Sequence, residues 1–267
     1  MRYIAAVFFF IFYTLWFSNE ALSATSPKEH PSSVKAKLTA ENFEDSVYHL
    51  YTRIGLANYN LSFAVFRYGI IGFQLLKQEG KINNTNVLTI IDFTKASTEK
   101  RFYTIDLERA EVLYCSYVSH GKNTGENVAT SFSNVMHSNQ SSLGFYITGE
   151  TYVGSKGFSL KLDGVEKGYN DNMRERAVVM HEAEYVSENW IKTYGRLGRS
   201  QGCPALPVEI SKQVIKTIKD RTPIFAYFND DQYLRSSVYL NIDRLLTTIE
   251  ENQQVNTLIP ISPSTLE

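Results

Sequence analysis

The stretch GRLGRSQGCPALP, residues 195–207, is the segment on which the interpretation of this chain depends. Gly195, Gly198 and Gly202 alternate with arginines and lead to Cys203. A glycine before a cysteine lets the backbone approach a substrate closely, and a nearby positive charge favours the nucleophilic thiolate. A tight turn holding a buried, inert cysteine would show the same pattern, so the stretch by itself leaves both interpretations open.

A histidine ends an apolar run upstream of this loop. The run AVVMH (177–181) predicts a strand, and a histidine at a strand end is well placed to project into a site. Histidine is the usual partner of a catalytic thiol, because it accepts the thiol proton and later protonates the leaving group. We therefore take Cys203 as candidate nucleophile, His181 as candidate base, and the amides of Gly202 and Cys203 as candidate oxyanion donors. A histidine buried in the core is the alternative for His181.

Short β-branched and aromatic runs surround these two segments and predict strands. The predicted strands are LTIIDFT (88–94), RFYTIDL (101–107), VLYCSYV (112–118), FYIT (145–148), FSLKLDG (158–164), AVVMH (177–181) and IFAYF (224–228). A short helix is expected to begin at Pro207. Several short strands preceded by helices predict an α+β fold built mainly around a β-sandwich.

Two helical stripes precede the strands. Apolar residues recur at helical spacing after Thr39 and again after Ser62, and these two residues are candidate N-caps. We expect an antiparallel helical pair at 39–80 that packs on a catalytic domain at 87–230, with partner binding as the alternative use of the pair. A C-terminal extension follows at 231–267, in which residues 243–250 fit a helix.

The first residues resemble an export signal. Arg2 supplies a positive charge, residues 4–17 form an uninterrupted apolar stretch, and ALSA (21–24) offers small residues for cleavage. The stretch is shorter than the roughly 20 residues that a membrane-spanning helix needs. We therefore expect a signal peptide at 1–24, with an uncleaved anchor as the alternative. A flexible, Pro- and Ser-rich lead-in is expected at 25–38.

The composition excludes several classes of protein. The chain has 267 residues, 21% of them charged, and a formal net charge of -1. These values are typical of a globular protein and argue against a nucleic-acid binder, which normally carries a basic patch. The histidines outside the candidate site make no metal-ligand spacing, and no phosphate-binding or dinucleotide motif is present. We therefore predict neither a metal nor a cofactor.

Cys115 and Cys203 are the two cysteines, and in an exported protein they could form a disulfide. Cys115 lies within the strand-like run at 112–118, where a cysteine acts as a small apolar side chain. Cys203 lies in a glycine-rich basic loop. Because these settings differ so much, we expect the two cysteines to remain unpaired.

Ordered segments of the chain resemble the L,D-transpeptidase catalytic domain, and more narrowly its murein L,D-transpeptidase branch. The matching stretches are VSHG (118–121), FSN (132–134), SSLGFY (141–146), YVG (152–154), RAVVMHEAEYVS (176–187) and GRLGRSQGCP (195–204). The resemblance covers about residues 87 to 228 and, more weakly, the two helices. It implies a mainly β-sandwich fold with Cys203 as nucleophile and His181 as base.

The chain departs from the wider family pattern around the nucleophile. That pattern is a histidine followed by S-H-G-C-[IV]-R, whereas this chain has Gln201 in place of the second histidine and Pro-Ala at 204–205. The arginine after the cysteine is therefore missing. We expect Arg199 or Arg196 to supply an equivalent positive charge.

The resemblance also implies contacts to a substrate. Arg199 is the preferred anchor for a substrate carboxylate, because a guanidinium pairs with a carboxylate in bidentate geometry. The further candidates are Arg196, Ser200, His120, Asn134, Tyr146 and Ser142. Each of these side chains is also suited to hydrogen bonds within a turn or the core.

The reaction implied is a two-step acyl transfer in the bacterial cell wall. Cys203 would attack the third residue of a peptidoglycan tetrapeptide stem, D-alanine would leave with a proton from His181, and a thioester would form. An amine of a neighbouring stem would then form a 3–3 cross-link, whereas water would make the same site an L,D-carboxypeptidase. An inactive wall-binding scaffold is the third alternative. The expected partners are peptidoglycan stem peptides, and the expected location is the periplasm or cell envelope.

Overall fold

The computed structural model describes residues 39–258, with side chains described as far as residue 252. The predicted signal peptide (1–24) and lead-in (25–38) lie outside the described residues. Within the described part, no helix is both long and apolar enough to cross a membrane.

The two N-terminal helices form where their caps predict. They are α1 (Ala40–Ile54) and α2 (Phe63–Gln78), joined by the 3-10 helix η1 (Leu56–Tyr59). Thr39 caps α1 in a capping box, and the Ser62 side chain accepts the Val65 amide at the start of α2. Gly55 ends α1 with a φ of 72°, a left-handed conformation that glycine adopts without strain.

Eight strands of the described chain form one sheet in the order β3-β2-β1-β8-β4-β5-β6-β7. They are β1 (Val87–Asp92), β2 (Phe102–Asp106), β3 (Glu111–Ser116), β4 (Gly144–Gly154), β5 (Gly157–Gly164), β6 (Val179–Glu182), β7 (Ala205–Leu206) and β8 (Pro223–Tyr227). β8 lies at the centre, parallel to β1 and antiparallel to β4. β6 and β7 are also parallel, and they are connected by a long crossover that contains the glycine-rich loop.

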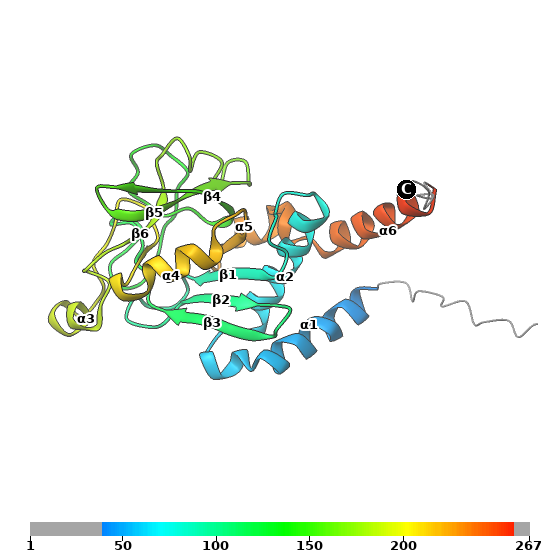
Figure 1. The fold of residues 1–267 in the computed structure, drawn as a ribbon, viewed down its shortest axis with the longest axis horizontal. Helices are drawn as coiled ribbons and strands as arrows, with labels where there is room; N and C mark the ends of the chain where they lie inside the picture. Colours follow the sequence, from blue (N-terminus) through cyan, green and yellow to red (C-terminus); the bar gives the residue numbers. More distant parts are fainter. Residues whose placement is uncertain (1–38, 259–267) are drawn as a thin grey trace, which may run out of the picture. The chain divides into compact units, whose positions relative to one another are not determined.

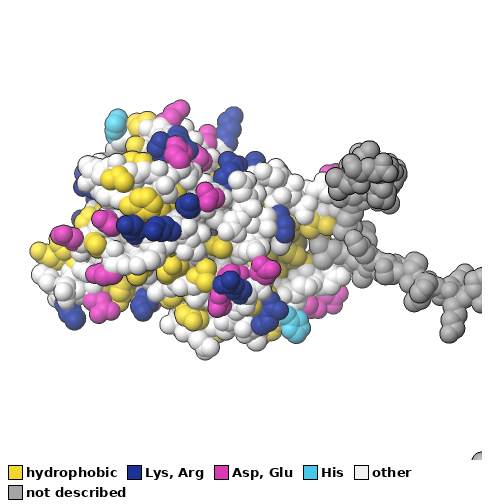
Figure 2. Space-filling view, in the orientation of Figure 1, with side chains coloured by type: hydrophobic (Ala, Val, Ile, Leu, Met, Phe, Trp, Pro, Cys, Tyr) yellow, Lys and Arg dark blue, Asp and Glu magenta, His cyan; other side chains and the backbone are white. Residues whose placement is uncertain are grey.

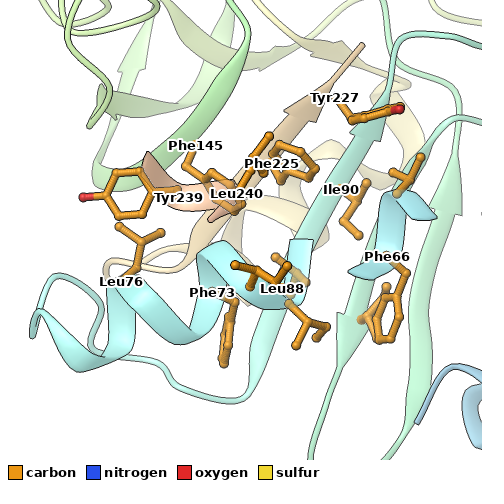
Figure 3. Close-up of a cluster of buried hydrophobic side chains, with 14 of the residues drawn as sticks. Phe66, Phe73, Leu76, Leu88, Ile90, Phe145, Phe225, Tyr227, Tyr239 and Leu240 are labelled. Atoms are coloured by element: carbon orange, nitrogen blue, oxygen red, sulfur yellow. The ribbon is translucent and has the colours of Figure 1, made fainter. Parts of the chain in front are cut away.

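Alternate residues of the central strands face two hydrophobic cores. In β1, Leu88 and Ile90 belong to the core beneath α2, whereas Ile91 belongs to the core on the opposite face. Figure 3 shows the first core, in which side chains of α2 lie close to those of β1, β4 and β8. Phe145 and Phe225 stack there with ring centroids 4.4 Å apart. The helical pair is therefore part of the core, and α2 closes one face of the sheet.

The second core surrounds α4. Phe102 of β2 and Met180 of β6 come from opposite parts of the sheet, yet both belong with Ile215 of α4 to this core. The sheet therefore curves around α4, which Figure 1 shows between the strand groups β1–β3 and β4–β6. The α+β class with an N-terminal helical pair is confirmed, and its sandwich is made by one curved sheet.

The remaining helices are short or follow the last strand. They are α3 (Glu188–Tyr194), α4 (Val208–Ile218), α5 (Asp231–Ser236), the 3-10 helix η2 (Val238–Leu240) and α6 (Ile242–Leu258). α4 begins after Pro207 as predicted, and α6 includes the residues that fit a helix. On the face shown in Figure 2, Lys and Arg side chains are interspersed with Asp and Glu, in agreement with the net charge of -1.

A buried carboxylate ties the start of β4 to the C-terminal helices. Glu166 is 4% exposed, and its oxygens accept hydrogen bonds from the Phe145 amide at 2.6 Å and the Tyr233 hydroxyl at 3.0 Å. The Ser237 hydroxyl donates to the other carboxylate oxygen. Burial raises the pKa of Glu166 above its ordinary value.

Replacing Glu166 by alanine is expected to lower the free energy of unfolding by about 3 kcal/mol or more, since three buried donors lose their acceptor at about 1–3 kcal/mol each. Denaturant unfolding measures this loss. Glu166→Gln, which keeps the shape, should cost less.

The raised pKa also gives this carboxyl a pH signature. Its contribution to stability is full below the unfolded value near 4.5 and is lost as the pH rises through the higher folded pKa. Wild type should therefore lose stability relative to Glu166→Gln over that window. A difference that stays constant with pH would contradict the raised pKa.

Candidate active site

The fold brings Cys203 and His181 to the same edge of the sheet, because Cys203 lies two residues before β7 and His181 lies on its partner β6. β6 and β7 pair in parallel with His181 opposite Ala205. The same register, continued two residues back, places Cys203 opposite Val179, and the Val179 amide donates to Cys203 Sγ at 3.4 Å. His181 and Cys203 are thus two positions apart in this register, on the same side of the backbone alternation. Two residues that are distant in sequence therefore share one end of the sheet.

The His181 ring is buried and is oriented by the backbone. The residue is 4% exposed, and its Nδ1 lies 2.7 Å from the carbonyl oxygen of Glu182. A carbonyl oxygen only accepts hydrogen bonds, so Nδ1 carries the proton and Nε2 is left unprotonated as the base. Burial lowers the pKa of His181 below its ordinary value, and the charge of Lys156 acts in the same direction. The ring is therefore neutral at pH 7 and able to accept a proton.

The His181 ring is expected to titrate with a midpoint below 6.5, because burial disfavours the imidazolium. Nuclear magnetic resonance of the histidine ring protons measures this midpoint directly. The spectrum of His181→Gln assigns the signal by its disappearance. A midpoint at or above 6.5 would mean that the site stabilises the charged ring, contrary to this geometry.

The Cys203 thiol is half-buried and free, as is that of Cys115. Cys203 Sγ accepts the Val179 amide and lies 4.0 Å from the Ala177 carbonyl oxygen, to which it donates. Burial raises the pKa of Cys203, while the Val179 amide and the charge of Arg176 lower it in part. Among residues 39–258 no hydrogen bond joins this sulfur to the His181 ring. The resting site is thus a neutral thiol near a neutral imidazole, a spacing that often tightens when substrate binds.

Ser200 closes the turn that carries the nucleophile. Its hydroxyl donates to the Cys203 carbonyl at 2.6 Å and accepts the Gly202 amide at 3.1 Å. The Gly202 amide is therefore used within the turn. Contrary to our expectation, it is not available to donate to an oxyanion. The Cys203 amide has no acceptor within the described part of the chain, so it remains the candidate oxyanion donor. Ser200 shapes the turn and is not directed at a substrate.

Residues 133–142, which we call the covering segment, pass directly over this turn. Gly202 has a φ of +119°, and a Cβ built on it would lie 2.7 Å from the Gln140 carbonyl oxygen. Gly121 forms a β-bridge with Ser200, and a Cβ on Gly121 would lie 2.4 Å from the Asn139 carbonyl oxygen. Both glycines are therefore required by the close approach of the covering segment.

Arg199 and Arg196 pair with Glu126 instead of approaching the thiol. Arg196 Nε lies 3.0 Å from one carboxylate oxygen, and Arg199 Nη1 lies 2.6 Å from the other. Arg199 also donates to the carbonyl oxygens of Lys122 and Gly125. The two arginines hold the neighbouring loop against the glycine-rich loop, and neither replaces the missing arginine.

Arg176 is the arginine whose charge acts on Cys203. Its Nη2 lies 3.4 Å from the position that a Cβ on Gly202 would occupy. Arg176 lies in the stretch RAVVMHEAEYVS that resembles the family, but no role was expected for it. The available signal was its place just before the strand that carries His181.

The other predicted substrate contacts are engaged inside the protein. His120 is 1% exposed, and its Nδ1 lies 2.7 Å from Nη2 of Arg101. Burial, aided by the charge of Arg101, lowers the pKa of His120 to about 3. Tyr146 is buried, and its hydroxyl donates to the Ser142 carbonyl. Asn134 lines a cavity of about 250 Å³, but its amide is hydrogen-bonded to the turn at 171–172.

Comparison with known proteins assigns the family. The family model of the L,D-transpeptidase catalytic domain matches residues 57–227, and the chain belongs to this family. The resemblance seen in the sequence is therefore confirmed. No curated protein matches the chain. Within the described residues no cluster of three or more His, Cys, Asp or Glu side chains is arranged to hold a metal ion.

Several solved L,D-transpeptidase structures match part of this chain. An L,D-transpeptidase from Mycobacterium smegmatis is 15% identical with a TM-score of 0.33, over 54% of this chain and 59% of that chain. L,D-transpeptidase 3 from Mycobacterium tuberculosis is 11% identical with a TM-score of 0.34, over 54% and 61%. This chain thus spans about three-fifths of the length of either structure. The family assignment rests on the sequence match.

Proposed function

We propose that this protein is a peptidoglycan L,D-transpeptidase that carries the donor stem as a thioester on Cys203. The observation that carries this proposal is the parallel pairing of β6 with β7, which brings the turn of Cys203 beside His181. The hydrogen bond of Nδ1 to the Glu182 carbonyl supports the role of His181, since it leaves Nε2 as the base. Membership of the L,D-transpeptidase family supports peptidoglycan stem peptides as the substrate.

In the first step, His181 Nε2 takes the thiol proton as Cys203 Sγ attacks the carbonyl carbon of the third stem residue. The Cys203 amide is placed to donate to the oxyanion that forms. The C–N bond to the terminal D-alanine then breaks, and the proton on Nε2 passes to the leaving amine. The products are free D-alanine and a thioester.

In the second step, an amine of a neighbouring stem attacks the thioester carbonyl and loses a proton to His181. The C–S bond breaks, the thiol is restored and a 3–3 cross-link remains. Because burial keeps His181 neutral, it can act as a base at neutral pH. Water in place of the amine gives a tripeptide and makes the reaction that of an L,D-carboxypeptidase.

Incubation of the reduced protein with tetrapeptide muropeptides tests the proposal. We expect 3–3 linked dimers, released D-alanine, and a transient mass increase on the protein that maps to Cys203. Tripeptide monomers without dimers would identify an L,D-carboxypeptidase at the same site. Absence of all products, together with failure of a thiol reagent to label Cys203, would indicate a wall-binding scaffold.

The proposal includes export to the periplasm or cell envelope, because peptidoglycan is assembled there. The apolar run at 4–17 and the small residues at 21–24 support export with cleavage. Fractionation of cells carrying the full chain, with intact mass measured on the recovered protein, tests both points. Recovery with the cytoplasmic fraction would contradict export, and a full-length mass in the membrane fraction would indicate an uncleaved anchor.

A further inference from the structure

We infer that Arg176 is a positioning residue that fastens the covering segment onto the Cys203 turn and holds a positive charge beside the thiol. It would thereby supply the positive charge of the arginine that is missing after Cys203. The inference rests on the proposed use of Cys203 as nucleophile, but its main test does not depend on any substrate.

Arg176 binds the covering segment at four points. Nη1 donates to the Ser133 carbonyl at 2.7 Å and to the Ser142 hydroxyl at 2.6 Å. Nη2 donates to the Gln140 carbonyl at 2.6 Å and to the Ser138 hydroxyl at 3.1 Å. One planar guanidinium thus spans both ends of the segment, a geometry that the single ammonium of a lysine does not reproduce.

The covering segment in turn contacts the catalytic turn. The Gln140 carbonyl that accepts from Arg176 is the group that leaves no room for a Cβ on Gly202. The Ser141 hydroxyl donates to the Gly202 carbonyl at 3.3 Å and accepts the Gly121 amide at 3.0 Å. Arg176 therefore acts on the position of the turn through a short chain of contacts.

The charge of Arg176 lacks a carboxylate partner among the residues that the structure describes. Arg199, by contrast, is paired with Glu126. The acidic groups whose charge acts on Arg176 are the buried Tyr146 phenol and the Cys203 thiol. Burial raises the pKa of Tyr146, so this phenol stays neutral. The anion that Arg176 is placed to stabilise is therefore the Cys203 thiolate formed during the reaction.

The titratable groups near the Cys203 turn lie on β6 or directly beside it. Arg176 precedes β6, His181 lies on β6, and Tyr185 follows it, with burial raising the pKa of Tyr185 to about 12. His181 is neutral at pH 7, and so is Tyr185. Arg176 is then the permanent charge in this group, and removing it should show directly in the ionisation of Cys203.

The test is the pH dependence of Cys203 alkylation by iodoacetamide, followed by intact mass in a Cys115→Ser background. We expect Arg176→Gln to move the midpoint upward and to slow alkylation at pH 7 by about threefold to tenfold, because an opposite charge within a few ångströms shifts a pKa by about one unit or more. Arg176→Lys should retain most of the wild-type midpoint, since it keeps the charge.

Two further variants distinguish the effect of the Arg176 charge on Cys203 from its hydrogen bonds to the covering segment. Arg174→Gln removes a neighbouring arginine that pairs with Asp163 and Glu150 on the surface, and it should leave the alkylation midpoint unchanged. Ser142→Ala removes one acceptor of Arg176 without removing charge. It should speed amide hydrogen exchange in the covering segment while leaving the midpoint in place.

An Arg176→Gln protein with a native circular dichroism spectrum and a wild-type midpoint would overturn the charge role. If Arg176→Gln does not fold, Arg176→Lys tests both roles, and a midpoint raised by about one unit or more in this variant, which keeps the charge, would overturn the charge role. Wild-type exchange rates in the covering segment of the lysine variant would overturn the fastening role. None of these readouts uses a muropeptide, so they stand apart from success or failure of the transpeptidase assay.

Discussion

Cys203→Ser is expected to abolish the covalent adduct with tetrapeptide muropeptides and to reduce turnover at least about a thousandfold. A serine hydroxyl is a far weaker acid than a thiol, and a neutral His181 is too weak a base to ionise it as readily. The fold should not change, because Cys203 is half-buried and its sulfur makes only weak hydrogen bonds. Intact mass after incubation and chromatography of the products measure the two effects.

Cys115→Ser is the matched control for this result. Cys115 is also a half-buried free cysteine, but it lies in β3, at the opposite edge of the sheet from β7. It should retain both the adduct and turnover, with at most a small loss of stability. Turnover within tenfold of wild type in a folded Cys203→Ser protein would remove Cys203 from the mechanism.

The second large effect is expected from Gly202→Ala. A φ of +119° is unfavourable for alanine, and its Cβ would lie 2.7 Å from the Gln140 carbonyl oxygen. That carbonyl is held by Arg176 and cannot move away without breaking the hydrogen bond. We expect a loss of about 2–4 kcal/mol in the free energy of unfolding, from strain and overpacking together. The thiol should also be displaced from His181, with near-complete loss of turnover.

Gly195→Ala is the control for backbone strain alone. Gly195 also has a positive φ, +68°, but a Cβ there would meet nothing within 4 Å. Gly195→Ala should lower the free energy of unfolding by about 1–2 kcal/mol and leave turnover unchanged. Denaturant unfolding and the muropeptide assay compare the two variants. Equal effects on turnover would mean that contact with the covering segment is unimportant.

The sequence predicts well those helices and strands that are determined by residues within the same segment. Thr39 and Ser62 begin helices because their side chains accept amides a few residues ahead. β1 and β8 are mostly apolar because every residue of both strands is buried. Short elements such as α3 have no buried residue of their own, so no apolar stripe reveals them.

The roles of the arginines could not be assigned from proximity in sequence. Arg199 is four residues from Cys203, yet Glu126 from another loop holds it away from the thiol. Arg176 is far from Cys203 in sequence, and the pairing of β6 with β7 brings it close. The same holds for the Gly202 amide, whose acceptor on Ser200 depends on the fold of the turn. Such placements follow from strand register, which one sequence does not reveal.

The central place of β8 affects the order in which the protein can be assembled during synthesis. β1 and β4 both pair with β8, which occupies residues 223–227, close to the end of the described chain. A nascent chain that stops before this strand has two ladders, β1–β3 and β4–β7, each with an unpaired apolar edge. Unpaired edges favour wrong pairing between chains, and contacts between distant segments form slowly. Protection of these two edges until β8 has been made would therefore favour correct folding.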